Sequence, residues 1–252
     1  MLRLSMLLFA ITLWPTALIS GLPTQIHGNY VSDFQKPLRS SLFADVKVVI
    51  AKESADDACL KKIEKRLHEL EATLGLTLDG KTVNLRYATD DPPELGDSDY
   101  ARTDPVLGDD KSVTLIVKKN ICTIGAKLLD IVIAHELFHV ERFTGKDGKE
   151  YREAQKEYQD ANDAYEKAAA AASEDPKDKD KNKAYAEALK KMRAAKAKAL
   201  KRLKKEEDDA FDFVKKNKDK LGLSEKDLEE NEKLRKEEQK DLDKQIAKQE
   251  RR

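Results

Sequence analysis

The segment that decides the fold is Ala126-Lys-Leu-Leu-Asp-Ile-Val-Ile-Ala-His-Glu-Leu-Phe-His-Val140. Apolar side chains occupy nearly every side of a helix drawn over this stretch, which is typical of a buried central helix. Thr123 can cap its start, and Gly145 and Gly148 bracket a turn before a further helix that begins near Lys149. Two histidines and a glutamate interrupt the apolar surface, and burying them is costly unless something pairs them. We therefore expect this helix to cross the core and to carry the chemistry of the protein.

The polar residues of this helix, His135, Glu136 and His139, form the pattern His-Glu-x-x-His. Residues at positions i and i+4 lie on one face of a helix, so both imidazoles can bind one zinc ion at about 2.1 Å. The glutamate lies near such an ion without being forced to bind it, and it can pass a proton from zinc-activated water to the leaving amine. The pattern therefore predicts Zn²⁺ as the cofactor, His135 and His139 as ligands, and Glu136 as the catalytic base and acid.

With its neighbouring elements, this motif resembles the zincin superfamily of metallopeptidases over roughly residues 45–160. The resemblance implies an α+β fold: a small zincin-like domain with a short mixed sheet and a central active-site helix. A charged C-terminal helical hairpin is expected to follow this domain. The resemblance also implies that a peptide substrate binds as an added strand along Ser112–Val117.

The third zinc ligand separates the zincin subfamilies, and the sequence leaves it open. A gluzincin-like layout places a glutamate on the next helix, where Glu153 fits best and Glu150 and Glu157 are further candidates. An aspzincin-like layout places an aspartate after a chain-reversing glycine, which favours Asp147, although the usual Gly-Thr-x-Asp is absent. Tyr151 either donates a hydrogen bond to the oxyanion or packs between helices. An ordinary exposed surface position is the alternative for each acid.

Local patterns place further elements before the motif. Asp45–Ile50, Thr82–Tyr87 and Ser112–Val117 have the β-branched or alternating character of strands. A helix capped by Ser54 is expected between the first two strands, because apolar residues recur there with a helical period. Residues 90–110 are rich in Asp, Pro and Gly, which predicts an irregular loop.

The N-terminal residues have the pattern of a secretory signal peptide over residues 1–20. Arg3 precedes a short apolar run that Pro15 interrupts, and this run is shorter than the roughly 20 residues that span a bilayer. We expect a secreted protein, extracellular or periplasmic, with no stable membrane insertion after signal cleavage. In such a compartment Cys59 and Cys122 favour a disulfide over two buried thiols.

The rest of the chain divides into a linker at 21–44, a zincin-like metallopeptidase domain at 45–172 and a charged helical extension at 173–252. Charged residues make up 38% of the chain, above the roughly 25% of ordinary globular proteins. They concentrate in the extension, where long helices broken near residues 175–181 and 221–224 are expected. These helices fit either a solvated hairpin or an arm that binds a protein partner.

The overall charge excludes one class of function and leaves two. Lysine plus arginine (48) equals aspartate plus glutamate (48), so the chain has no global field to attract nucleic acid. The first hypothesis is a secreted zinc-dependent metalloendopeptidase that hydrolyses peptide or protein substrates through a metal-activated water. The alternative is a non-catalytic secreted helical interaction protein with a structural or absent metal site.

Overall fold

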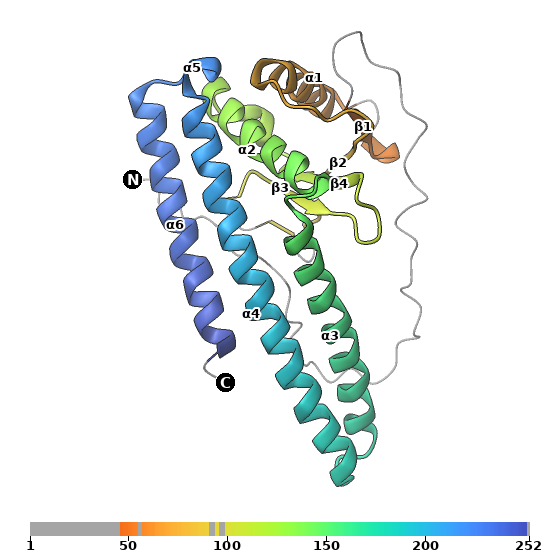
Figure 1. The fold of residues 1–252 in the computed structure, drawn as a ribbon. Coiled ribbons are helices and arrows are strands. Elements are labelled where there is room, and N and C mark those ends of the chain that lie inside the picture. Colours follow the sequence, from red (N-terminus) through yellow and green to blue (C-terminus); the bar gives the residue numbers. More distant parts are fainter. Residues whose placement is uncertain (1–45, 55–56, 91–93, 96–98, 251–252) are drawn as a thin grey trace.

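A computed structural model describes residues 46–54, 57–90, 94–95 and 99–250 of the chain. It shows an α+β fold in which a small mixed sheet is accompanied by two shorter helices and three long ones (Figure 1). The predicted signal peptide (1–20) and linker (21–44) lie outside the described residues. Within these residues, no helix combines the length and apolar character that a membrane span requires.

The sheet has four strands in the order β1-β2-β4-β3. The central strands β2 (Thr82–Tyr87) and β4 (Ser112–Val117) pair in parallel, as do β1 (Lys47–Ile50) and β2. These three strands confirm the sequence prediction. The edge strand β3 (Ala101–Pro105) runs antiparallel to β4.

The β3 strand corrects two expectations. It lies inside residues 90–110, which were predicted to form an irregular loop. Its short sequence lacks the alternation typical of a strand, and pairing with β4 stabilises the extended conformation that local propensity does not favour. Its presence also places β4 between two neighbours. With both edges of β4 paired, the expected role of Ser112–Val117 as the substrate-binding strand is wrong, and the free edge belongs to β3.

Helix α1 (Ala58–Leu74) begins at Asp57 rather than at Ser54. The Asp57 carboxylate accepts hydrogen bonds from the backbone N–H groups of Cys59 and Leu60, at 2.8 and 3.0 Å. Beside this cap, Cys59 forms the expected disulfide with Cys122, which lies in the short 3-10 helix η2 (Ile121–Thr123). A second 3-10 turn, η1 (Lys52–Ser54), precedes α1. The disulfide thus fixes the start of α1 to the segment that leads into the motif helix.

Helix α2 (Ala126–Thr144) is the predicted central helix. Its N-cap is Gly125, because the Thr123 hydroxyl donates to the carbonyl of Asn120 and so belongs to η2. The turn after α2 depends on Gly148, where an added Cβ would lie 2.2 Å from a backbone carbonyl oxygen. Helix α3 (Lys149–Glu174) starts directly after this glycine, as expected.

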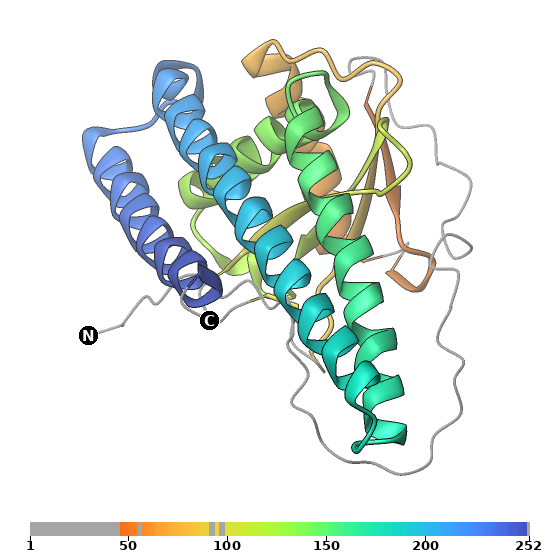
Figure 2. The ribbon, with the colours of Figure 1, turned by 60° about the horizontal axis from the view of Figure 1, so that its bottom comes forward.

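The C-terminal half of the structure consists of α3, α4 (Lys179–Lys216), the single turn α5 (Lys218–Leu221) and α6 (Glu225–Glu250). Figures 1 and 2 show α4 between α3 and α6, with the far ends of α3 and α4 projecting away from the sheet. Gly222 ends α5 in the left-handed conformation at φ 60°, which turns the chain back into α6.

The predicted boundary at residue 173 does not separate two cores. Leu203 and Val214 of α4 and Leu242 of α6 belong to the same buried cluster as Leu115 of the sheet and Leu137 of α2. A solvated extension is therefore the wrong description for this part of 173–252. The charged composition concealed a narrow apolar stripe that is sufficient to bury one side of each helix. A small second cluster packs the first half of α3 against the middle of α4, through Ala154, Tyr158, Met192, Ala195 and Ala199.

Candidate metal centre

Helix α2 directs both motif histidines to one point. The Nε2 atoms of His135 and His139 lie 3.1 Å apart. Phe211 packs edge-on against the His135 ring, and Phe143 stacks on the His139 ring, with ring centroids 4.8 and 5.1 Å apart respectively. His139 is only 3% exposed. Aromatic packing thus fixes the two imidazoles in the orientation that a shared ligand requires.

The third donor at this point is Glu207 of α4. One carboxylate oxygen lies 2.9 Å from Nε2 of His135, and the other lies 3.4 Å from Nε2 of His139. The three residues form the one group among the described residues whose donor atoms could hold a metal ion, with all donors within 4.8 Å of one another. Sequence analysis did not identify Glu207.

The donor set fits a zinc ion. Ligand atoms bonded tetrahedrally at 2.0–2.1 Å from zinc lie about 3.3 Å from one another. The closest separations here run from 2.9 to 3.4 Å. Two imidazole nitrogens and one carboxylate are also the ligand set of a common class of catalytic zinc sites, in which the fourth position stays open.

The electrostatics of the three donors favour a positive charge between them. Burial disfavours the ionised form of Glu207, but the neighbouring imidazoles outweigh it and hold the pKa of this carboxyl well below its usual range. Burial likewise disfavours protonated His139, yet the Glu207 carboxylate prevails and raises the pKa of this imidazole. A buried anion that favours a proton on His139 would also favour a cation between the donors.

A second ion pair sets the position of α4 against α2. The Arg142 guanidinium donates to both carboxylate oxygens of Glu206, at 2.9 and 3.0 Å. Glu206 immediately precedes Glu207, so this bidentate contact fixes the rotation of α4 that points Glu207 at the histidines. The contact joins two helices far apart in the sequence.

Glu136, the predicted catalytic base, lies beside the same cavity. Its carboxylate accepts a hydrogen bond of 2.7 Å from the Thr103 hydroxyl on the edge strand β3. Burial raises the pKa of Glu136, although the two imidazoles act in the opposite direction. A buried carboxyl in this position can accept and return a proton.

The structure does not bring the expected third ligands to the histidines. Glu153 has a side chain 65% exposed and pairs with Lys149, and Asp147 is 78% exposed and pairs with Arg142. Of the further candidates, Glu150 and Glu157 form ion pairs with α4 residues at the protein surface. The structure therefore does not place Glu153 or Asp147 at the histidines, because Asp147 lies exposed in the turn before Gly148 and Glu153 faces solvent on α3.

Tyr151 also lies away from the donor atoms. It is buried between helices, where its ring stacks on Phe143 and its hydroxyl accepts a hydrogen bond of 2.7 Å from Gln155. Burial raises its pKa strongly. The structure therefore supports the packing role for Tyr151, and Tyr100 is the tyrosine that lines the cavity beside the histidines.

The cavity at the three donors is small, about 80 Å³. Four elements enclose it: the β3 strand with the residues before it, α2, α4 and α6. Its walls outside the motif and Glu207 comprise Asp99, Tyr100, Ala101, Arg102, Thr103, Ile131, Val132, Leu203, Phe211, Asn231, Leu234 and Glu238. Three of these residues come from α6, so the C-terminal helix covers the candidate metal centre.

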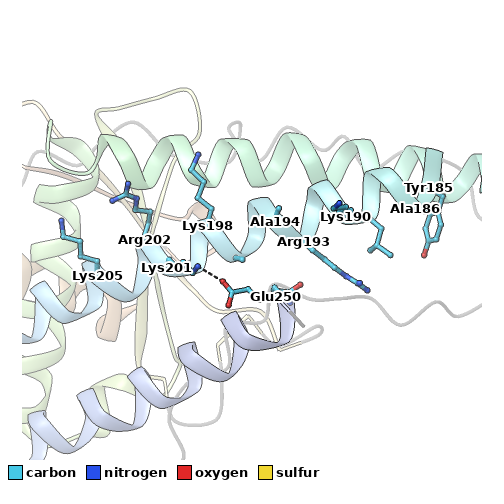
Figure 3. Close-up of a pocket in the computed structure, with 13 residues that line it drawn as sticks. Tyr185, Ala186, Lys190, Arg193, Ala194, Lys198, Lys201, Arg202, Lys205 and Glu250 are labelled. Carbon is cyan, nitrogen blue, oxygen red and sulfur yellow. Dashed lines mark ion pairs between the residues drawn. The ribbon is translucent and has the colours of Figure 1, made fainter. Parts of the chain in front are cut away.

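A larger groove of about 1030 Å³ runs along α4 beside the end of α6 (Figure 3). Its lining combines apolar side chains with basic ones such as Lys190, Lys201 and Lys205, and Glu250 pairs with Lys201 at 2.6 Å. The groove contains no cluster of metal-binding side chains among the described residues. This groove is thus separate from the candidate metal centre.

One feature of the sequence could have identified Glu207. It follows Leu200 and Leu203 and precedes Phe211 and Val214 with the three- and four-residue spacing of a single helix face. A carboxylate in an apolar stripe indicates a buried group that needs a partner. The run of acids from Glu206 to Asp209 concealed this position among ordinary surface charges.

Comparison of the chain with protein-family models, with curated proteins and with solved structures returned no match.

Proposed function

We propose that this protein is an exported zinc-dependent endopeptidase of the zincin type, in a gluzincin-like arrangement. The observation that carries the proposal is the convergence of His135, His139 and Glu207, whose donor atoms are spaced as zinc requires. Glu136 adds a buried proton-transfer group beside them. Together these residues match the machinery of metal-assisted peptide hydrolysis.

Each residue has a defined task in this proposal. His135, His139 and Glu207 would hold the ion, which when bound would supply Lewis-acid activation of water and of the scissile carbonyl. Glu136 takes a proton and returns it to the leaving amine, helped by the raised pKa that its burial causes. Thr103 keeps the Glu136 carboxylate in place through its hydrogen bond.

The substrate side of the proposal is the edge strand β3. A peptide in extended conformation can add to the free edge of a sheet through backbone hydrogen bonds. Residues of β3 line the cavity next to Glu136, so this edge directs a bound backbone toward the three donors. Leu203 and Phe211 of α4 give the cavity apolar walls, which favours an apolar side chain next to the cleaved bond.

Export is the part of the proposal that rests on the sequence. The N-terminal pattern over residues 1–20 favours secretion, and the disulfide between Cys59 and Cys122 is consistent with an oxidising compartment. A protein partner for the charged C-terminal helices stays a prediction.

The experiment compares zinc content and peptide hydrolysis in matched variants of the full chain. Wild type is expected to bind one equivalent of zinc, and His139→Ala to bind far less. Glu136→Gln should keep its zinc and lose hydrolysis by about 100-fold or more, as expected for removal of the proton-transfer group. Glu153→Gln is the control, because it changes an exposed glutamate that lies apart from the donors.

Two results would count against the proposal. Zinc content that is unaffected by His139→Ala would place the ion elsewhere. Zinc bound at this site without hydrolysis of any peptide in a diverse library would favour the alternative, a non-catalytic interaction protein with a structural metal. This result would have to hold both in wild type and in a variant in which the contacts of α6 are weakened.

A further inference from the structure

Helix α6 presents an unusual face to the candidate metal centre. Asn231, Leu234 and Glu238 recur at helical spacing and line the cavity that contains the three donors. All three are buried, and Glu238 is only 2% exposed. Two of the three side chains are polar, so this contact is not an ordinary apolar packing surface.

Two oxygen atoms of this face have no hydrogen-bond partner within the protein. Oδ1 of Asn231 and Oε1 of Glu238 are buried without a hydrogen-bond partner. A buried oxygen left unpaired costs about 1–3 kcal/mol, and more when it is charged. Two such atoms in one cavity indicate that something else occupies the space between them and the donors.

Glu238 also shares this cavity with a second carboxyl group. Both Glu238 and Glu207 are buried and line the same small space. Two buried carboxylates in one cavity are costly unless a cation lies between them. The cavity also contains the imidazole–carboxylate donor set, so a divalent cation would satisfy both features.

Two kinds of contact attach α6 to the rest of the molecule. Arg235 binds Asp208 and Asp212 of α4 at 2.8 and 2.7 Å, and its side chain is 23% exposed. Leu242 and Ile246 of α6 also belong to the main buried cluster. Ion pairs that solvent can reach contribute about 0–1 kcal/mol each, so the contacts of Arg235 are the weaker part of this attachment. Opening them is thus the least costly step in releasing α6 from α4.

From these features we infer that α6 is an inhibitory cap, which places the Glu238 carboxyl on the open side of the metal centre and must withdraw before a peptide can enter. The inference rests on the proposed zinc peptidase function and adds its regulation. In the closed form Glu238 takes the position that substrate and water need. Breaking the contacts between α6 and α4 exposes the site.

The test uses zinc-loaded full-length protein and two measurements, the rate of zinc removal by an excess of a chromogenic chelator and the rate of peptide cleavage. Glu238→Gln removes the charge, and Arg235→Ala loosens the helix while leaving the carboxyl intact. Both are expected to accelerate zinc removal and peptide cleavage by about 10-fold or more. Lys244→Ala is the control, because its ion pair with Asp241 lies within α6. Circular dichroism verifies that each variant is folded.

The outcomes separate the cap from the peptidase proposal. Unchanged zinc removal in folded Glu238→Gln and Arg235→Ala would overturn the cap, whatever the peptidase activity. Faster zinc removal in both variants, without peptide cleavage by wild type or by either variant, would support the cap and overturn the peptidase proposal. Loss of cleavage in Glu238→Gln with zinc retained would also overturn the cap, since it would make Glu238 a requirement for catalysis.

Discussion

The two halves of α4 are both highly charged, yet they have opposite surroundings. The distal half, residues 179–199, is rich in Lys and Ala and lies against α3 in a hairpin that projects from the sheet (Figure 2). The proximal half, residues 200–216, carries a higher share of charged residues, yet it lies between α2 and α6 and buries Glu206 and Glu207. Composition therefore does not decide which charged helix is solvated. The partners that tertiary packing brings to each face decide it.

The two halves of α4 also differ in which acidic side chains are buried and in what those side chains contact. In the distal half, acids such as Glu187 are exposed. In the proximal half, each buried acid faces a group that compensates it, since Glu206 binds Arg142 and Glu207 meets two imidazoles. The distal half also buries a charged residue, Lys196, whose ammonium lies 5.8 Å from the centroid of the Tyr158 ring. The buried acids of α4, in contrast, lie at or next to the candidate metal centre.

The largest expected effect comes from exchanging a glutamate in each half. Glu207→Gln should weaken zinc binding by about 1,000-fold, or about 4 kcal/mol, because it removes a metal ligand. Replacing a residue that only hydrogen-bonds to a ligand lowers metal affinity by about 10–100-fold. Glu187→Gln should leave zinc binding unchanged. Competition with a zinc indicator measures both. Equal affinities for the two variants would show that the proximal half provides no ligand.

A leucine truncation in each half sharpens the comparison for stability. Leu203→Ala should lower the free energy of unfolding by about 3 kcal/mol, because Leu203 is 2% exposed in the main core. Leu189→Ala should cost about 1 kcal/mol, since Leu189 is only partly buried in the small second cluster. Denaturant-induced unfolding measures both values, and a larger loss for Leu189→Ala would reverse the assignment of the core.

An arginine exchange gives the smallest difference. Arg142→Ala should lower the free energy of unfolding by about 2 kcal/mol, because it leaves the buried Glu206 without its bidentate partner. Arg202→Ala, at the surface between α3 and α4, should cost less than about 1 kcal/mol. Chemical denaturation compares the two variants at low and high salt. Equal losses would indicate that the contact of Arg142 with α4 is no stronger than a surface pair.

Much of the fold was predictable because its signals are local. The strands β2 and β4 and the central helix α2 follow from patterns read within a few residues, and the prediction placed β2 and β4 at their observed bounds. The short strand β3 was missed, because its order depends on pairing with β4 rather than on its own residues. The start of α1 was also misplaced, since Ser54 and Asp57 are both capable of capping it.

The sequence by itself determined that His135, Glu136 and His139 share one turn of a buried helix, because helical spacing requires only neighbouring residues. Tertiary structure alone decided that Glu207, and not Glu153 or Asp147, completes the group, and that α6 covers it. The choice among many surface-like acids depends on how distant helices pack, and no local spacing encodes that packing. The physical reason is that a metal site needs donors within a few ångströms in space, whatever their separation along the chain.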